Sequence, residues 1–205
     1  MYAPPFGRLK TKDKSELLKV IRSTKIKMGK LRRKMESPAY KEEVIVCPSN
    51  STIYKCDREF LEMAIMEYTL LGGDYKESKK EVADRLFNER LKDVVKITFR
   101  KGGFDRREKT IVDLTEEKPI FLFGFFGDFT ERYGEIEKED FLAELESLHI
   151  GEWKKEYRCE DYGLVVLDGE EWELVFEYKD GKTRSYYGHE AYPYNFDELL
   201  SLLEG

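Results

Sequence analysis

The chain of 205 residues is 40% hydrophobic, 14% aromatic and 38% charged, with a net charge of −6. This composition excludes a disordered chain, and the length fits one domain or two small ones. No apolar run approaches the ~18–20 residues of a membrane span, and the N-terminal sequence lacks the apolar stretch of a secretory signal. The odd number of cysteines, three, favours a reducing compartment over a disulfide framework. We therefore expect a cytoplasmic protein without a membrane span.

Positive charge is concentrated in the first segment of the chain. Residues 1–34 contain twelve lysines and arginines and two acidic residues, a net charge of +10. Residues 35–205 contain 24 basic and 40 acidic residues, a net charge of −16. A basic arm next to an acidic body either binds a partner or docks on the protein's own surface, and the sequence leaves both interpretations open.

The basic segment contains a predicted helix that runs from a cap at Ser15 to about Met35. With Thr24 included, its apolar residues are spaced alternately by four and three positions, which indicates one narrow apolar seam. The seam consists of Leu17, Ile21, Met28, Leu31 and Met35. Because the seam is short for a free coiled coil, we expect it to pack on another element, or to form a homodimer through its first four apolar residues. The helix is expected to end at Ser37, because the residue before a proline avoids the α region.

Two further helices are expected before the sheet. A strand at 44–47 precedes a helix that Asp57 caps and Gly72-Gly73 ends. A third helix runs from about Lys76 or Ser78 to Asp93, and its apolar residues face one side. These elements make residues 1–94 a basic, mostly helical part of the chain.

After this part the apolar period changes from that of a helix to two, which is typical of strands. A strand at 95–99 turns at Gly102-Gly103 and returns at 110–114. An aromatic run at 119–126 follows. The aromatic residues from Phe121 to Phe129 are candidates for lining a ligand pocket, but a continuous apolar run is more typical of a buried strand. A fourth helix is expected at about 138–149.

The C-terminal end shows the clearest pattern. Large apolar residues alternate with polar ones from Trp172 to Tyr178, which predicts a half-buried strand. Asp180-Gly181 supplies the positive φ that a tight hairpin turn requires. Asn195, with Glu198 three residues later, is a predicted cap for a last, leucine-rich helix.

These elements predict an α+β fold. N-terminal helices pack on a mostly antiparallel β-sheet with two further helices, and the chain ends in a C-terminal hairpin plus a capping helix. The helical part spans 1–94 and the α+β part spans 95–205, and we expect the two to form one compact unit.

Four stretches near the C-terminus carry a resemblance to known proteins. They are residues 141–153, 167–172, 178–181 and 188–196, which consist of turn, core and capping residues. In these stretches the chain resembles the C-terminal part of small, uncharacterised cytoplasmic proteins of Gram-positive anaerobic bacteria. The resemblance implies a bacterial, cytoplasmic origin and an α+β unit, and it carries over no catalytic residue.

No motif specifies a reaction, so our first hypothesis is a binding or interaction protein without catalytic activity or cofactor, whose partner is an unknown protein. Our second hypothesis is a nucleic-acid-binding protein, because basic side chains on an exposed helix neutralise phosphates. The residues that would do so lie off the seam and are Lys19, Arg22, Lys30, Arg33 and Lys34. They would equally serve an acidic protein or an anionic membrane surface. Tyr2, Phe6 and Tyr40 are candidates for base stacking.

A third hypothesis is a metal-dependent nuclease of the restriction-endonuclease type, in which two carboxylates bind Mg²⁺ and a lysine helps to activate water. Asp168 followed by Glu177 and Lys179 has the required order, and Asp105 with 116–118 is a weaker version. However, Glu177 and Lys179 alternate with the apolar strand residues, where solvated side chains belong. Such combinations also arise by chance in a chain rich in glutamate and lysine.

The cysteines and histidines are expected to have structural roles. A metal site formed by Cys47, Cys56 and Cys159 with a histidine is possible in principle. Because Cys47 and Cys56 are further apart than the C-x₂₋₄-C pair of structural zinc sites, no metal site is predicted. His149 lies at a predicted helix end, where a positive imidazole complements the helix dipole, and His189 lies in a glycine-rich turn. A catalytic Cys/His pair would need one of the three thiols near His149 or His189 with an orienting acid, and nothing in the spacing supports such a pair.

Overall fold

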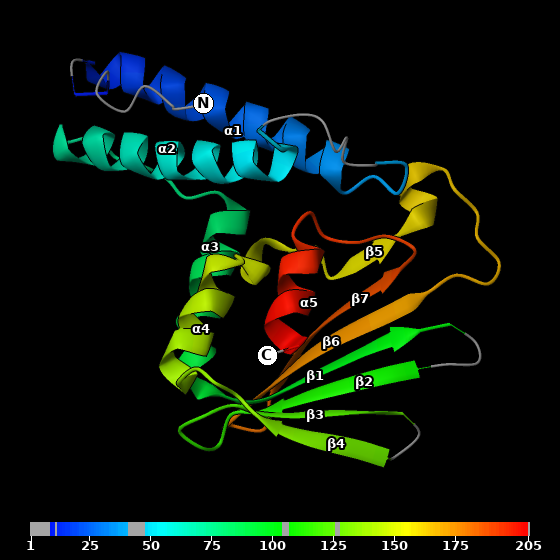
Figure 1. Cartoon of the computed structure of the whole chain (residues 1–205). Helices are drawn as coiled ribbons and strands as arrows, with labels where there is room; N and C mark the ends of the chain where they lie inside the picture. The colour runs from blue at the N-terminus through cyan, green and yellow to red at the C-terminus, as the bar shows by residue number, and fades with distance from the viewer. Residues whose placement is uncertain (1–8, 11, 41–47, 104–106, 126–127, 205) are drawn as a thin grey trace. The chain divides into compact units, whose positions relative to one another are not determined.

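The computed structural model divides the chain into two compact units, Met1–Glu77 and Ser78–Gly205, which we call the helical unit and the sheet unit (Figure 1). The structure describes residues 9–10, 12–40, 48–103, 107–125 and 128–204. The division falls before the third helix, whereas the sequence analysis placed it at 94/95.

Helices and strands occur largely in separate runs along the chain, with three helices before four strands, as in an α+β fold. The helices are α1 (Lys14–Met35), α2 (Asn50–Leu70), α3 (Lys79–Asn88), α4 (Lys138–Ser147) and α5 (Phe196–Glu204), with short 3-10 helices η2 (Leu91–Asp93), η3 (Ile150–Glu152) and η4 (Cys159–Tyr162). The strands are β1 (Val94–Gly102), β2 (Arg107–Asp113), β3 (Ile120–Phe125), β4 (Asp128–Tyr133), β5 (Glu156–Arg158), β6 (Glu171–Tyr178) and β7 (Thr183–His189).

All seven strands belong to one sheet with the order β4-β3-β2-β1-β6-β7-β5. Every neighbouring pair is antiparallel except β5 and β7, which are parallel. The predicted α+β class with a mostly antiparallel sheet is therefore confirmed. Within the described ranges, none of the helices combines the length and the apolar character needed to cross a membrane.

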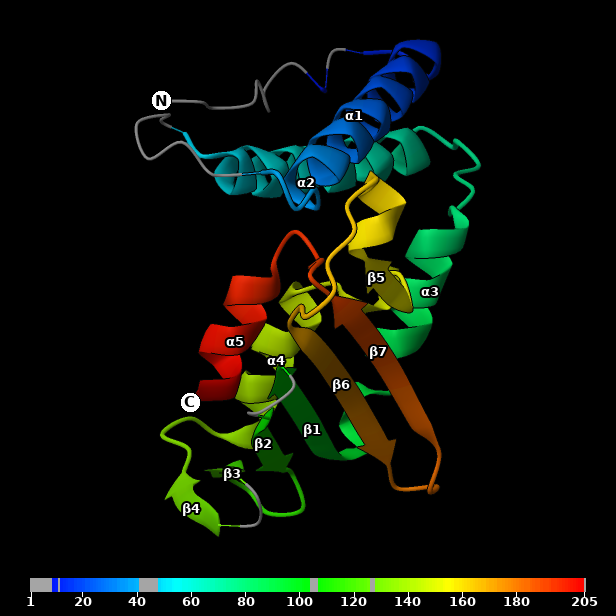
Figure 2. The ribbon, with the colours of Figure 1, turned by 90° about the vertical axis from the view of Figure 1, so that its right-hand side faces the viewer.

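The helical unit is an antiparallel hairpin of α1 and α2, which lie side by side in Figures 1 and 2. Lys14, at the start of α1, donates from Nζ to the carbonyl of Gly72 beyond the end of α2 at 3.5 Å. The seam that the spacing predicts is buried at Leu17, Ile21 and Met28. Because α1 packs along α2, the seam has a partner within the chain, and a homodimer through it stays a prediction.

The structure corrects the predicted start of α1, whose cap is Asp13 rather than Ser15. The Asp13 carboxylate accepts a hydrogen bond from the Glu16 amide at 2.8 Å, and the Glu16 carboxylate accepts one from the Asp13 amide at 3.2 Å. This reciprocal pair is a capping box. The carboxylates also complement the positive end of the helix dipole, which a neutral serine cap two residues later would not do.

The start of α2 also differs from the prediction. Ser49 caps this helix, because its side chain accepts a hydrogen bond from the Thr52 amide at 3.1 Å. The prediction that Asp57 is the cap is wrong, since the helix opens about two turns earlier. Asp57 is instead buried within α2, and the Lys27 ammonium lies 2.7 Å from its carboxylate. The predicted strand at 44–47 lies outside the described residues.

The hairpin of β6 and β7 forms as the sequence predicts. Burial alternates along β6, and Gly181 adopts the positive φ of 77° that the turn requires. The register sets Glu177 opposite Thr183. In contrast, β4 was not predicted as a separate strand, because all of its side chains are exposed and its residues lack a regular apolar alternation.

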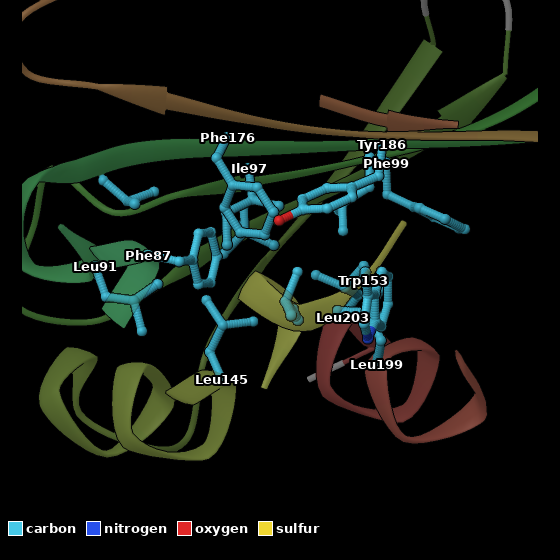
Figure 3. Packing of buried hydrophobic residues seen from close by; sticks show 14 of the residues in the cluster. Phe87, Leu91, Ile97, Phe99, Leu145, Trp153, Phe176, Tyr186, Leu199 and Leu203 are labelled. Carbon is cyan, nitrogen blue, oxygen red and sulfur yellow. The ribbon is translucent and has the colours of Figure 1, made fainter. Parts of the chain in front are cut away.

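The core of the sheet unit lies between one face of the sheet and the helices α3, α4 and α5 (Figure 3). Phe87 of α3 packs edge-to-face on Phe176 of β6 with ring centroids 5.1 Å apart, and Phe141 of α4 packs in the same way on Phe121 of β3 at 6.0 Å. Fully burying an aromatic side chain contributes about 1.5–3 kcal/mol. Phe196 of α5 packs on Phe99 of β1 with ring centroids 5.9 Å apart, so all three helices pack on the same side of the sheet.

Asn195 precedes α5, as expected, but its side chain forms hydrogen bonds with residues far away in the sequence. The indole of Trp153 donates to the Asn195 side-chain oxygen at 3.1 Å, and the Asn195 amide donates to the carbonyl of Leu148 at 2.7 Å. Both bonds reach residues that follow α4. Asn195 thus joins the end of α4 to the start of α5, and this use could not be inferred from a capping pattern.

Candidate functional site

One side of α1 carries a cluster of basic side chains, which we call the basic face. Its members are Lys19, Arg22, Lys30, Arg33 and Lys34, and all five are exposed. With 3.6 residues per turn they fall within an arc of about 120° on the side opposite to the buried seam. The row from Lys19 to Arg33 is about 21 Å long at 1.5 Å per residue. The residues proposed from the sequence for binding thus share one surface.

The first four members of the basic face form no ion pair within the part of the chain that the structure describes. Two other cations of α1 behave differently: the Lys27 ammonium lies 2.7 Å from Asp57, and the Arg32 guanidinium lies 2.7 Å from Glu36. Ile26, in the middle of the basic face, is 62% exposed. The charge of the basic face is therefore not neutralised by described residues, and it attracts anionic groups.

The aromatic residues considered for base stacking give little support to that role. Tyr2 and Phe6 lie outside the described residues. The Tyr40 hydroxyl accepts a hydrogen bond from the Asn50 amide at 2.7 Å, and the Lys34 ammonium lies 5.8 Å from its ring centroid. Since a lysine of the basic face already lies over this ring, Tyr40 positions a cation rather than offering a free stacking surface.

The residues of the nuclease hypothesis do not converge. Asp168 precedes β6, whereas Glu177 lies near the far end of that strand, about 20 Å from its start at ~3.3 Å per residue. Glu177 pairs with a lysine of β1 at 2.7 Å, and the Lys179 ammonium lies 4.0 Å from Asp93. Two carboxylates that share one Mg²⁺ must both approach it to about 2.1 Å. The arrangement therefore does not support this site, and Asp105 of the weaker version lies outside the described residues.

A cluster that the sequence analysis did not predict lies where β5 pairs with β7. The parallel register sets Arg158 opposite His189, so the next two residues, Cys159 and Glu160, lie beside this histidine. The Cys159 Sγ is 3.9 Å from His189 Nδ1, and the Glu160 Oε1 is 3.8 Å from the same nitrogen. A thiol, an imidazole and a carboxylate thus meet within 4.8 Å of one another. We call these three residues the Cys-His-Glu cluster.

The protonation states of the Cys-His-Glu cluster do not suit nucleophilic catalysis. Burial raises the pKa of the Cys159 thiol, and the charge of Glu160 adds to the rise, so the thiol keeps its proton near neutral pH. A hydrogen bond from its own backbone amide lowers the pKa of Glu160, so this side chain is an anion. A reactive cysteine requires a thiolate and access to solvent, whereas Cys159 is protonated and fully buried.

A second acid–histidine pair fastens η3 to α3. His149 follows α4 in the left-handed conformation, with a φ of 49°, and its Nδ1 is 2.6 Å from the Asp84 carboxylate. Gly151 packs so closely on α3 that an added Cβ would lie 2.3 Å from the Cα of Asp84. The Arg184 guanidinium donates to the Gly151 carbonyl at 3.2 Å. His149 therefore pairs with a carboxylate, whereas the sequence analysis predicted only a favourable interaction with the helix dipole.

A hollow of about 240 Å³ opens on the sheet at the ends of β1 and β6. It is lined by Arg100, Lys101, Gly102, Glu171, Trp172, Glu173 and Tyr187. Arg100 forms an ion pair with Glu173, and Lys101 forms one with Glu170 at 3.3 Å. Since its basic side chains are already paired, the hollow is a weaker candidate for a charged ligand than the basic face.

The basic face and the Cys-His-Glu cluster differ in the sequence signal that they carry. The basic face lies on a helix whose seam is visible at spacings of three and four. Cys159 and His189 are 30 residues apart in the sequence, and the three-residue strand β5 brings them together. A strand of this length has no measurable period, so a single sequence contains no signal for the pairing.

Comparison with known proteins supplies no relative from which a function can be transferred. No family model matches the chain, and neither a curated protein nor a solved structure matches it. Function is therefore inferred from the surfaces of the two units themselves.

Proposed function

We propose that this protein is a bacterial cytoplasmic binding protein without catalytic activity, and that it binds an anionic partner through the basic face of α1. The observation that carries the proposal is a row of four exposed cations with no ion pair to other described residues. The odd cysteine count supports a reducing compartment, and the resemblance of the C-terminal stretches supports a bacterial origin.

A nucleic acid is the partner that we test first. Duplex DNA presents a phosphate about every 3.4 Å along each strand, so a row of cations about 21 Å long spans several phosphates. Contacts of this kind position a protein on the backbone and carry no direct sequence information. We therefore expect binding that depends strongly on salt and weakly on base sequence. An acidic protein surface is the alternative partner, because it offers the same charge.

The test compares the intact protein with a variant whose basic face is neutralised. This variant carries Lys19→Gln, Arg22→Gln, Lys30→Gln and Arg33→Gln. A control variant loses the same charge at exposed lysines elsewhere and carries Lys76→Gln, Lys79→Gln, Lys92→Gln and Lys155→Gln. Fluorescence anisotropy of short labelled DNA and RNA, measured over a salt series, gives the affinity and its salt dependence for each protein.

We expect the intact protein and the control variant to bind with similar affinity, and log K to fall linearly with log salt by about 0.9 per neutralised phosphate. The basic-face variant should bind at least about tenfold more weakly, with a slope smaller by up to about 3–4. Equal losses of nucleic-acid affinity in both variants would show that the charge of the basic face contributes no more to binding than charge elsewhere on the surface. If the intact protein binds neither DNA nor RNA, the same titration with poly-glutamate tests the acidic-protein alternative.

A further inference from the structure

The Cys-His-Glu cluster brings together three kinds of side chain that metal ions bind. We propose that Cys159, Glu160 and His189 hold one Zn²⁺ ion, or a divalent ion of similar size and softness. The ion would join η4 to the end of β7, beside the parallel pairing of β5 with β7. This inference is independent of the anionic partner proposed for α1.

The distances between the three ligand atoms fit a shared ion. Zinc binds sulfur at about 2.3 Å and nitrogen or oxygen at about 2.0–2.2 Å, so two ligands at a tetrahedral angle lie about 3.4–3.6 Å apart. The separation is 3.9 Å between the cysteine Sγ and the histidine Nδ1, and 3.8 Å between that nitrogen and the glutamate Oε1. Side-chain rotations that shorten these two separations by a few tenths of an ångström bring both pairs to ligand distance, and the third pair, Cys159 and Glu160, lies within 4.8 Å.

The chemistry of the donors selects the class of metal. A thiolate is a soft ligand and an imidazole is borderline, and this combination favours zinc over magnesium and calcium, which prefer oxygen ligands. When the ion binds, the Cys159 thiol gives up its proton, because the thiolate is the metal ligand. The thiolate and the Glu160 carboxylate then supply two negative charges, which balance the charge of one divalent ion.

The surrounding backbone aims these donors at one point. Gly163, with a φ of 76°, closes the turn of η4 that carries two of the three ligands. Gly169 packs against the other nitrogen of His189, since an added Cβ would lie 2.6 Å from Nε2. Nδ1 is therefore the nitrogen that faces Cys159.

The cluster is closed on its sulfur side and open on its carboxylate side. Cys159 is fully buried, whereas the side chains of His189 and Glu160 are 19% and 52% exposed. Three protein ligands leave a tetrahedral ion one position for water or an external ligand. An ion can therefore enter and leave from solvent without unfolding of the sheet unit.

The second acid–histidine pair provides an internal comparison. Asp84, His149 and Glu152 also lie within 4.8 Å of one another. However, the Asp84 carboxylate is already hydrogen-bonded to His149 Nδ1 at 2.6 Å. That separation is shorter than the ~3.4 Å between two ligands of one zinc ion, and the group contains no thiol. The Cys-His-Glu cluster is the stronger candidate, and His149 is its matched control.

A titration of the full-length chain with Co²⁺ tests the site, because Co²⁺ accepts the ligands of zinc and absorbs light when a thiolate binds it. The starting protein carries Cys47→Ser and Cys56→Ser, so that Cys159 is the only thiol. We expect one equivalent of Co²⁺ to produce thiolate-to-cobalt charge-transfer absorption, and Zn²⁺ to abolish it by displacement. Saturating Zn²⁺ should also raise the thermal midpoint of the sheet unit by several degrees, because a ligand of the folded state stabilises it.

Substitutions assign the three ligands. Cys159→Ser should eliminate the charge-transfer absorption, His189→Asn and Glu160→Gln should each weaken Co²⁺ binding at least about tenfold, and His149→Asn should leave binding unchanged. Glu160 is exposed, so its variant keeps the test decisive even where a substitution of the buried cysteine prevents folding. The proposal is overturned if Co²⁺ at micromolar concentration produces no thiolate absorption, or if Glu160→Gln binds Co²⁺ as tightly as the starting protein.

Discussion

The two units of this protein use charged side chains in opposite ways. On the sheet unit, cations and anions pair across neighbouring strands, as Lys96 does with Glu177 at 2.7 Å. On the helical unit, four cations of α1 share one exposed face and form no ion pair with other described residues. Opposite charges across a strand pair contribute roughly 0.2–1 kcal/mol, whereas like charges on one helix face destabilise by similar amounts. The helical unit therefore retains a charge that a binding partner can neutralise.

The hydrophobic cores of the two units differ in size. The sheet unit buries a continuous cluster of aromatic and aliphatic side chains beneath three helices. The helical unit is built from a single pair of helices, whose buried apolar side chains form one seam. Because a smaller core supplies less stabilisation, we expect the helical unit to be the less stable of the two. Both tryptophans belong to the sheet unit, so tryptophan fluorescence reports on that unit alone, while circular dichroism reports on both.

The largest effect is expected from a cavity in the core of the sheet unit. Phe176 is fully buried and packs on Phe87 and Tyr186, so Phe176→Ala should lower the free energy of unfolding by about 3–5 kcal/mol. Urea unfolding followed by tryptophan fluorescence measures this loss. Phe125→Ala is the control, because that side chain is 46% exposed and its removal should change stability by less than ~0.5 kcal/mol. Similar losses in both variants would contradict the assigned core.

A charge in the seam of α1 should give the next largest effect, confined to the other unit. Met28 is 6% exposed, and Met28→Glu should destabilise the helical unit by about 3 kcal/mol, because a carboxylate is costly to bury without a partner. Circular dichroism should show the loss while the tryptophan transition stays in place. Ile26→Glu, at an exposed position of the same helix, should have little effect. Light scattering on the same variants tests the homodimer, which an unchanged mass for Met28→Glu rejects.

These two units also show which features a sequence can reveal. The seam of α1 and the Asp180-Gly181 turn were predicted, because each depends on residues close together in the chain. The cap at Ser49 was missed, because a serine after a proline is read equally well as a turn. The Cys-His-Glu cluster was missed for a different reason: its residues meet only when β7 is paired with β5. Local physics fixes helices and turns, whereas strand pairing decides which distant side chains become neighbours.

Neutralising the partly buried ion pair of Lys27 and Asp57 should have an intermediate effect on the helical unit. The Asp57 side chain is 5% exposed and lies 2.7 Å from the Lys27 ammonium. Lys27→Met keeps the apolar stem but leaves the carboxylate with a weaker set of partners, which should lower stability by about 1–3 kcal/mol. Lys19→Met is the matched control on the same helix, because this side chain is exposed and part of the basic face. If both variants lose the same stability, the ion pair of Lys27 with Asp57 stabilises the helical unit no more than an exposed lysine of the basic face does.

Two glycine substitutions should change the stability of the two units in opposite directions, with the smallest effects. Gly29 lies inside α1, where an added Cβ has nothing within 4 Å, so Gly29→Ala should stabilise the helical unit by about 0.5–1 kcal/mol through helix propensity. Gly181 adopts a φ of 77° in the β6–β7 turn. A Cβ at that φ is strained whatever the surrounding space, so Gly181→Ala should destabilise the sheet unit by about 1–2 kcal/mol. The fluorescence transition should shift only for Gly181→Ala, whereas circular dichroism reports on both units and should detect both changes. A shift of the fluorescence transition by Gly29→Ala would show that the two units unfold as one.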